Sequence, residues 1–257
     1  MSHASARTIL IFTRAPAAEA RAKRLHVRLG AALFGAFLSA WRRIAAETGS
    51  DLLVVAPRDS VATLCRMLPG VDVAAQPDGR FDVKLNTAFD LAFRSGANAV
   101  LMVGGDSPPL PPAQVRRAFD HLERDARGLV LAPAHDGGVN AIGLTPTTPR
   151  PFDSVGWMTP AVHRHLCAAA ERLGLTLFET PSCPDLDAVH LVRSLCLGGR
   201  IPPLWRAYRW LMRALMPSAL AGEACTLVPR PLFRSFSRIT RGPPTVLVDQ
   251  THRRLAA

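Results

Sequence analysis

Short apolar runs separated by segments of helix length constrain this chain more than any other feature of its sequence. The runs are rich in β-branched residues and lie at 8–13, 51–56, 71–75, 97–103, 128–132 and 175–178. Strands that are apolar on both faces belong to a sheet that helices cover on both sides. The alternation therefore predicts a doubly wound, mostly parallel α/β sheet of at least six strands over residues 8–180.

Four of the intervening segments carry helical signals. They span residues 31–48, 85–95, 112–124 and 160–173. In the first segment, Leu33, Phe37 and Trp41 form one apolar stripe. The last two segments begin at prolines, which suit the first turn of a helix, and the last is expected to end at Gly174.

Length and composition bound the domain organisation. With 257 residues, 48% of them hydrophobic, the chain can bury one large core and is not disordered throughout. Beyond residue 200 prolines accumulate and the alternation stops, so we predict a domain over residues 1–200 and a basic tail or small subdomain over 201–257. The five cysteines form no C-x-x-C pair, which is typical of a reducing compartment rather than of disulfides or a zinc site. Because we find neither a signal peptide nor an apolar run of membrane-spanning length, we expect a cytoplasmic protein.

The net charge of +11 comes almost wholly from arginine, since Lys23 and Lys84 are the only lysines. Arginine makes bidentate contacts with phosphate, so this balance suits a nucleotide diphosphate, a nucleic acid or an anionic membrane surface. A base-composition bias of the genome would give the same total. Residues 204–216 form a predicted basic amphipathic helix, which can make a peripheral membrane contact or pack onto its own domain.

The strongest chemical motif is LMVGGDSPPLPP at residues 101–112, where a strand runs into two glycines and then Asp106. In open α/β sheets, ligands bind beyond the carboxyl ends of the strands. A carboxylate at that place can hold Mg²⁺ or Mn²⁺ against phosphate oxygens, and the glycines let the backbone approach a ligand closely. The alternative is that Asp106 caps the next helix.

A second acidic turn, AHDGG, follows the next predicted strand and carries Asp136. Taken alone, D-G-G is only a turn signal. Because two such turns end consecutive strands, we expect Asp106 and Asp136 to open onto one cleft.

The loop after the first strand is basic, with Arg14, Arg21, Lys23 and Arg24. Such a loop can neutralise a diphosphate, or it can simply be the solvated start of a helix. It contains neither G-x-G-x-x-G nor G-x-x-x-x-G-K-[ST], so dinucleotide-binding and P-loop sites have no support.

Two further pairs of residues have side chains that can bind metal ions. Asp185 and Asp187 form a D-x-D that can bind a metal or cap a helix. His163 and His165 are two residues apart on a predicted helix, so their side chains face apart and do not form a metal pair.

The order of these motifs resembles a bacterial family of small GT-A-type glycosyltransferases, uncharacterised or of the arsenosugar-biosynthesis type, in the nucleotide-diphospho-sugar transferase superfamily. The matching positions are Phe12-Thr13-Arg14-Pro16, Arg24-Leu25, Gln76, Gly79, Gly105-Asp106-Ser107-Pro108, Leu110-Pro111, Asp136-Gly137-Gly138, Ile142-Gly143-Leu144, Trp157, Thr159-Pro160, Val162, Asp185 and Asp187. The chain departs from the family where Glu19 replaces a glycine and Lys23 a threonine.

The resemblance implies a GT-A-like sheet and metal-assisted transfer of a sugar from a nucleotide-diphosphate sugar to a small-molecule acceptor. Asp106 and Asp187 would hold Mg²⁺ or Mn²⁺, and Asp136 would position or deprotonate the acceptor hydroxyl. Contacts with the donor are assigned to Arg14, Lys23, Arg24, Gly105, Ser107, Gly137, Gly138 and Trp157. No nucleic-acid partner is expected. Two alternatives stay open: a nucleotidyltransferase that joins a nucleoside triphosphate to a phosphorylated small molecule, and a catalytically degenerate relative with a binding role.

Overall fold

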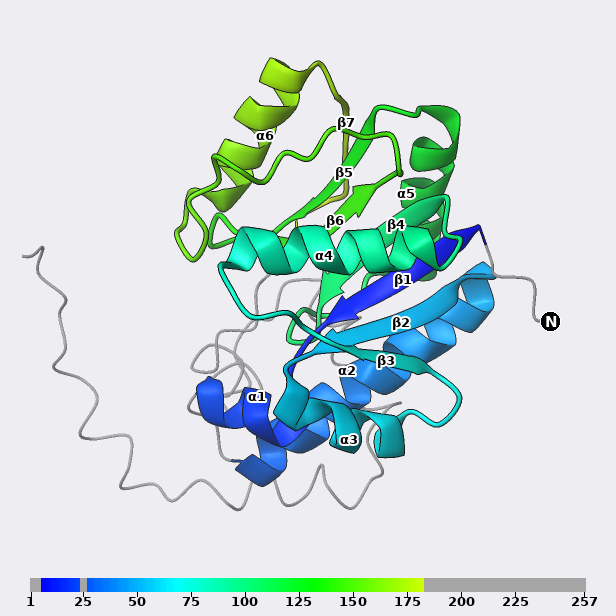
Figure 1. Cartoon of the computed structure of the whole chain (residues 1–257), viewed down its shortest axis with the longest axis vertical. Helices are drawn as coiled ribbons and strands as arrows, with labels where there is room; N and C mark the ends of the chain where they lie inside the picture. Colours follow the sequence, from blue (N-terminus) through cyan, green and yellow to red (C-terminus); the bar gives the residue numbers. More distant parts are fainter. Residues whose placement is uncertain (1–5, 24–26, 183–257) are drawn as a thin grey trace, which may run out of the picture. The chain divides into compact units, whose positions relative to one another are not determined.

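The described part of the chain builds a seven-stranded sheet with helices on both faces (Figure 1). The computed structural model describes residues 6–23 and 27–182. The strands are β1 (Arg7–Phe12), β2 (Asp51–Ala56), β3 (Asp72–Ala75), β4 (Ala99–Gly104), β5 (Gly128–Pro133), β6 (Val139–Leu144) and β7 (Thr176–Glu179). Their spatial order is β3-β2-β1-β4-β6-β5-β7, and only the two pairs that β6 makes are antiparallel. The predicted mostly parallel α/β sheet is therefore confirmed.

The strand β6 is the one that the sequence analysis does not anticipate. It follows the D-G-G turn, forms a hairpin with β5 and pairs on its other side with β4. The alternation of strands and helices predicts parallel neighbours joined by helical crossovers, and a tight turn between two strands breaks that rule. The six predicted strands lie within two residues of their expected bounds at each end.

The described helices are α1 (Pro16–Ala22), α2 (Val27–Thr48), α3 (Arg58–Met67), α4 (Phe81–Arg94), α5 (Pro112–Arg124) and α6 (Val162–Leu173). The four predicted helices correspond to α2, α4, α5 and α6, and α5 has the predicted bounds. Gly174 follows α6 with a φ of 61°, the left-handed conformation in which a glycine commonly ends a helix. The short helices α1 and α3 were not predicted.

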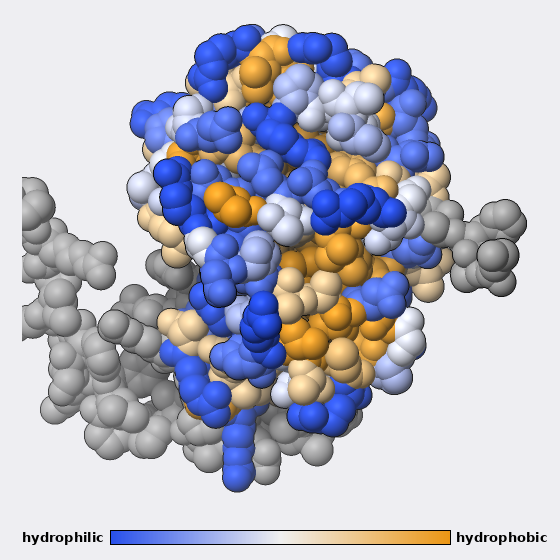
Figure 2. Space-filling view, in the orientation of Figure 1, coloured by the Kyte–Doolittle hydropathy of each residue, from blue (hydrophilic) through white to orange (hydrophobic). Residues whose placement is uncertain are grey.

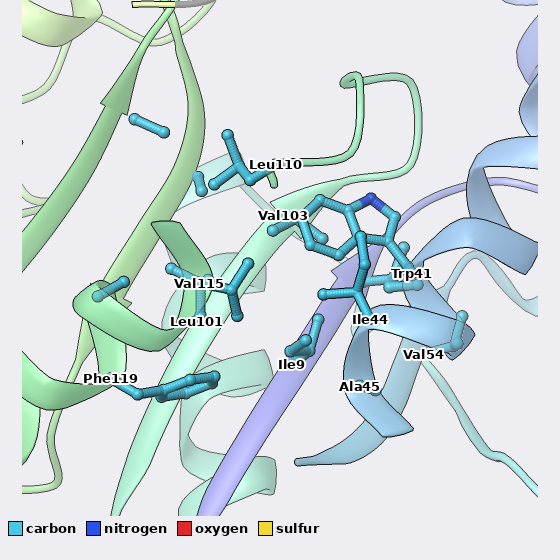
Figure 3. Close-up of a cluster of buried hydrophobic side chains, with 14 of the residues drawn as sticks. Ile9, Trp41, Ile44, Ala45, Val54, Leu101, Val103, Leu110, Val115 and Phe119 are labelled. Atoms are coloured by element: carbon cyan, nitrogen blue, oxygen red, sulfur yellow. The ribbon is translucent and has the colours of Figure 1, made fainter. Parts of the chain in front are cut away.

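Two hydrophobic cores hold the helices on opposite faces of the sheet. On one face, α2, α3 and α5 pack on the strands, and Figure 3 shows Trp41 of α2 opposite Val103 of β4. On the other face lie α4, with the fully buried Phe89, and α6, with the fully buried Leu166. Burial of one such side chain contributes about 1.5–3 kcal/mol. Because both faces of the central strands are covered, these strands are apolar on both sides.

The direction of the strands decides where the loops meet. β1 and β4 are parallel neighbours, with Phe12 beside Gly104 at their carboxyl ends. β5 is antiparallel to β6, which is antiparallel to β4, so β5 ends at the same edge. The turns after β1, β4 and β5 therefore meet at one edge of the sheet, as predicted for the turns that carry Asp106 and Asp136.

The surface of the described residues is mixed in polarity. Figure 2 shows hydrophobic side chains gathered over the strands below α4, while hydrophilic side chains cover most of the rest of this face. Within residues 6–23 and 27–182, no helix is both long and apolar enough to cross a membrane. The predicted boundary at residue 200 and the predicted helix over 204–216 lie outside the described residues.

Candidate functional site

A cleft of about 740 Å³ opens at the carboxyl edge of the sheet. Its walls come from the ends of β1 and β4, the β5–β6 turn, α1, the start of α4 and the segment 157–160. The predicted site residues that line it are Arg14, Lys23, Asp106, Ser107, Asp136, Gly138 and Trp157. The structure thus brings together seven of the assigned residues from four separate stretches of the chain, whereas Arg24 and Asp187 lie outside the described residues.

Asp106 lies directly beyond β4, in a turn that the backbone NH of Ser107 closes by donating to the carbonyl oxygen of Gly104 at 3.2 Å. Its Oδ2 atom is 2.5 Å from Nζ of Lys23, which ends α1. The alternative role of Asp106 as a helix cap is wrong, because Pro111 holds the N-cap position of α5 and no side chain caps that helix. The carboxylate is therefore free of the helix and faces the cleft.

Glu19 is a functional candidate that the sequence analysis did not assign. It projects from α1 into the cleft, is 6% exposed, and accepts hydrogen bonds from Nη1 of Arg14 at 3.2 and 3.3 Å. Burial raises the pKa of this carboxyl, and the nearby Asp106 carboxylate raises it further, against the opposing effect of Arg14. An acidic residue within an otherwise basic loop is the signal that could have pointed to it.

Gly105 packs against the chain itself, and it does not line the cleft. A Cβ atom at this position would lie 1.9 Å from Oγ1 of Thr13, the first residue beyond β1. The glycine therefore lets the turns after β4 and β1 come into contact, which no other residue type would allow without movement. Its expected approach to a ligand stays a prediction.

Asp136 lies at the tip of the β5–β6 hairpin. Its Oδ1 accepts a hydrogen bond from the backbone NH of Gly138 at 2.9 Å, so the D-G-G sequence is a turn and also places a carboxylate in the cleft. Gly137 has a φ of 88°, and a Cβ there would lie 2.0 Å from the carbonyl oxygen of Pro160. Gly137 consequently joins the turn to the segment before α6 instead of lining the cleft.

Aromatic side chains, Phe81 and Trp157, form another part of the cleft lining. Trp157 packs edge-on against Phe81 at 5.0 Å between ring centroids and against Phe152 at 5.9 Å. The next residue, Met158, is 91% exposed and has a φ of 63°, an unusual conformation for a residue with a side chain. Strained backbone of this kind is often found at functional sites, yet nothing in the sequence marks Met158.

Some, but not all, of the basic residues expected at the site line the cleft. Both lysines of the chain, Lys23 and Lys84, line it, and Arg14 joins them from the end of β1. Arg21, expected to act with them, is exposed on α1 and does not line the cleft. Acidic and basic side chains both line the cleft, so the basic ones can bind a phosphate group and the acidic ones a metal ion.

Part of the chain matches a protein family, and its fold matches that of solved structures. Residues 40–159 match the model of a family described as "Uncharacterized protein conserved in bacteria (DUF2064)". No curated protein shows significant sequence similarity to the chain.

Solved structures resemble this chain over most of its length. A candidate nucleotide-diphospho-sugar transferase of Desulfovibrio desulfuricans G20 is 22% identical and gives a TM-score of 0.65 over 82% of this chain and 98% of its own. A cytidylyltransferase of Leptospira borgpetersenii is 14% identical, with a TM-score of 0.50 over 78% and 89% of the two chains. A candidate glucose-1-phosphate thymidylyltransferase of Bacillus anthracis is 12% identical, with a TM-score of 0.50 over 76% and 96%. Residues 40–159 are therefore similar to this bacterial family, and the sheet has the fold of the candidate nucleotide-diphospho-sugar transferase of Desulfovibrio desulfuricans.

Proposed function

We propose that this protein is a glycosyltransferase that takes a sugar from a nucleotide-diphosphate donor and passes it to the hydroxyl group of a small acceptor. The observation that carries the proposal is that both lysines of the chain line the same cleft as Asp106 and Asp136. Lysine is a common phosphate-binding point charge, and the volume of about 740 Å³ lies in the range of small-ligand sites. The fold supports a nucleotide-dependent transferase.

The diphosphate of the donor would lie between Lys23, Lys84 and Arg14. All three belong to the cleft lining, and they come from three different elements or loops, so one anion can meet them from several sides. Each charge-assisted contact is worth about 1.5–3 kcal/mol when it is shielded from water. The same groups would hold the nucleoside diphosphate that leaves.

A divalent cation fits the oxygen ligands of this site on one condition. Asp106 offers the carboxylate oxygens that Mg²⁺ and Mn²⁺ prefer, but Lys23 already lies 2.5 Å from one of them. A cation at Asp106 therefore requires Lys23 to move toward the phosphates. When bound, the cation would neutralise the charge that develops on the diphosphate. Asp187, assigned as a second ligand, lies outside the described residues.

Asp136 is the residue that we assign to the acceptor. Its hydrogen bond to the NH of Gly138 fixes its orientation, and it is exposed to the cleft. In the transfer, the acceptor oxygen forms a bond with the anomeric carbon, the bond from that carbon to the diphosphate oxygen breaks, and Asp136 takes the hydroxyl proton. Trp157 and Met158 would contact the sugar or the acceptor at the rim.

Calorimetry with UDP and GDP, with and without Mn²⁺, tests this proposal. We expect one of them to bind with Mn²⁺ present, Asp106→Ala to remove the Mn²⁺-dependent part, and Asp72→Ala, an exposed residue of β3 outside the cleft lining, to bind like the parent. If neither nucleotide binds, or if Asp106→Ala binds like the parent, the chain is a degenerate relative. Release of pyrophosphate from a nucleoside triphosphate would instead identify a nucleotidyltransferase.

A further inference from the structure

A second cluster of chemically active side chains lies outside the cleft lining, between α6 and β7. His163 and Cys167 come from α6, and Glu179 comes from the end of β7. Nε2 of His163 contacts Oε1 of Glu179, and Sγ of Cys167 lies 3.4 Å from the same Nε2. One nitrogen, one sulfur and one oxygen all lie within 4.8 Å of one another.

Sequence spacing does not reveal this group. His165, two residues from His163, lies elsewhere, because its Nδ1 accepts a hydrogen bond from the NH of Gly156 at 3.1 Å. The partner of His163 is Cys167, four residues along and on the same helix face. Glu179 then comes from a strand that pairs with β5, and no sequence spacing reveals it.

The donor atoms suit a borderline-soft divalent cation. Zn²⁺ binds imidazole nitrogen, thiolate sulfur and carboxylate oxygen, and tetrahedral geometry places such atoms about 3.3–3.7 Å from one another. The observed separations reach this range with small side-chain rotations, because all three atoms already lie within 4.8 Å. Mg²⁺ and Mn²⁺, which prefer oxygen ligands, are poorly matched to the same set.

The elements that carry the three residues are fixed by packing. α6 buries Leu166 and Ala170 in the core, and β7 is held by its parallel pairing with β5. The backbone NH of His163 donates to the carbonyl oxygen of Gly137 at 3.0 Å, so the first turn of α6 also supports the hairpin that carries Asp136. An ion at the cluster would therefore tie together α6, β7 and, through His163, one wall of the cleft.

We propose that His163, Cys167 and Glu179 form a site for one Zn²⁺ ion per chain, separate from the cation site at Asp106. Three protein ligands leave a fourth position for water or another donor, as in open zinc sites. Whatever occupies the open position, the ion would fasten α6 to β7 and help to hold the Asp136 turn in position. The proposal does not depend on the identity of the reaction.

The test is metal uptake by the full-length chain, stripped with a chelator and kept reduced with a phosphine. After dialysis against Zn²⁺, we expect about one tightly bound ion per parent chain, and with Co²⁺ a thiolate-to-metal absorption band. Cys167→Ser, His163→Ala and Glu179→Gln should each weaken binding at least about tenfold, and Cys167→Ser should remove the Co²⁺ band. Matched controls of the same residue types, Cys65→Ser, His135→Ala and Glu47→Gln, should bind like the parent; all three residues lie outside the cluster.

Thermal melting separates loss of the ion from loss of the fold. Zn²⁺ should raise the melting temperature of the parent and of Cys65→Ser, and leave that of Cys167→Ser unchanged. If Cys167→Ser fails to fold, Glu179→Gln carries the test, because Glu179 is exposed. The proposal is overturned if the parent takes up no Zn²⁺, if the Co²⁺ form lacks the thiolate band, or if the three cluster variants bind as tightly as the controls.

Discussion

The ammonium group of Lys23 lies 2.5 Å from Oδ2 of Asp106, so a cation from the end of α1 already neutralises the carboxylate at the end of β4. Both side chains are partly exposed, at 20% and 30%. The contact therefore sets up a competition between the lysine and a metal ion for the same carboxylate. Glu19, buried beside them, adds a second negative charge to this end of the cleft.

Removing Lys23 should change metal and nucleotide binding in opposite directions. In Lys23→Ala, Mn²⁺ no longer competes with the ammonium group, so its affinity should rise. UDP or GDP without metal should bind roughly 10- to 100-fold more weakly, because one charge-assisted contact of about 1.5–3 kcal/mol is lost. Calorimetry measures both. Arg43→Ala, which removes an exposed charge of α2 away from the cleft, should change neither; unchanged Mn²⁺ affinity in Lys23→Ala would contradict the competition.

Glu19 should give the stability of the protein a distinctive pH dependence. Its pKa in the folded state is raised above the ordinary 4.5, so the folded protein binds this proton more tightly than the unfolded chain does. The free energy of unfolding then falls as pH rises through the window between 4.5 and the raised pKa. Relative to Glu19→Gln, the parent should lose stability across this pH window. Below the window, the difference in the free energy of unfolding between the two proteins should be constant.

Urea unfolding at a series of pH values checks this prediction. Glu47→Gln, at an exposed site near the end of α2, is the control and should keep the pH dependence of the parent. A parent that gains stability over Glu19→Gln as the pH rises would show that the Glu19–Arg14 ion pair outweighs burial.

Two glycine substitutions should have opposite effects on stability. Gly105→Ala places a methyl group 1.9 Å from Oγ1 of Thr13 and should cost about 1–3 kcal/mol, the usual cost of overpacking. Gly35→Ala lies within α2, meets only Cε of Met67 at 3.6 Å, and should gain about 0.5–1 kcal/mol from helix propensity. Chemical denaturation measures both values. Equal stability of the two variants would mean that the turns after β1 and β4 separate easily.

We expect Met158 to lower the stability of the protein while contributing to its activity. Met158→Gly should stabilise the protein by about 1 kcal/mol, because glycine adopts the left-handed conformation without strain. Little stability should be lost with the side chain, because it is 91% exposed. If this side chain contacts the sugar or acceptor, transferase activity falls at the same time. Met67→Gly, in the last turn of α3, should instead lower stability by helix propensity and leave activity unchanged.

The parts of the fold that could be predicted are those with a local cause. The apolar runs give six strands because burial on both faces requires continuous hydrophobicity, and Pro112 and Gly174 give helix ends because of their backbone preferences. The sharing of one cleft by Asp106 and Asp136 follows from strand direction alone.

The parts that could not be predicted depend on contacts between distant residues. β6 is short and apolar like its neighbours, and only its partners reveal that it runs antiparallel. The family resemblance marks Glu19 as a replaced glycine, but neither its burial nor its pairing with Arg14 can be inferred from the sequence. The cluster of His163, Cys167 and Glu179 needs a helix and a strand to meet before it exists.

The central position of β1 has a consequence for the making of the protein. Thr8 pairs with Asp51 on one side and with Val100 on the other, so β1 stays half paired until β4 has been synthesised. At about 5–20 residues per second, this gap lasts several seconds. During that time an apolar strand edge is open to pairing with other chains. Translation speed between residues 56 and 104 should therefore govern how much of the protein escapes aggregation in the cell.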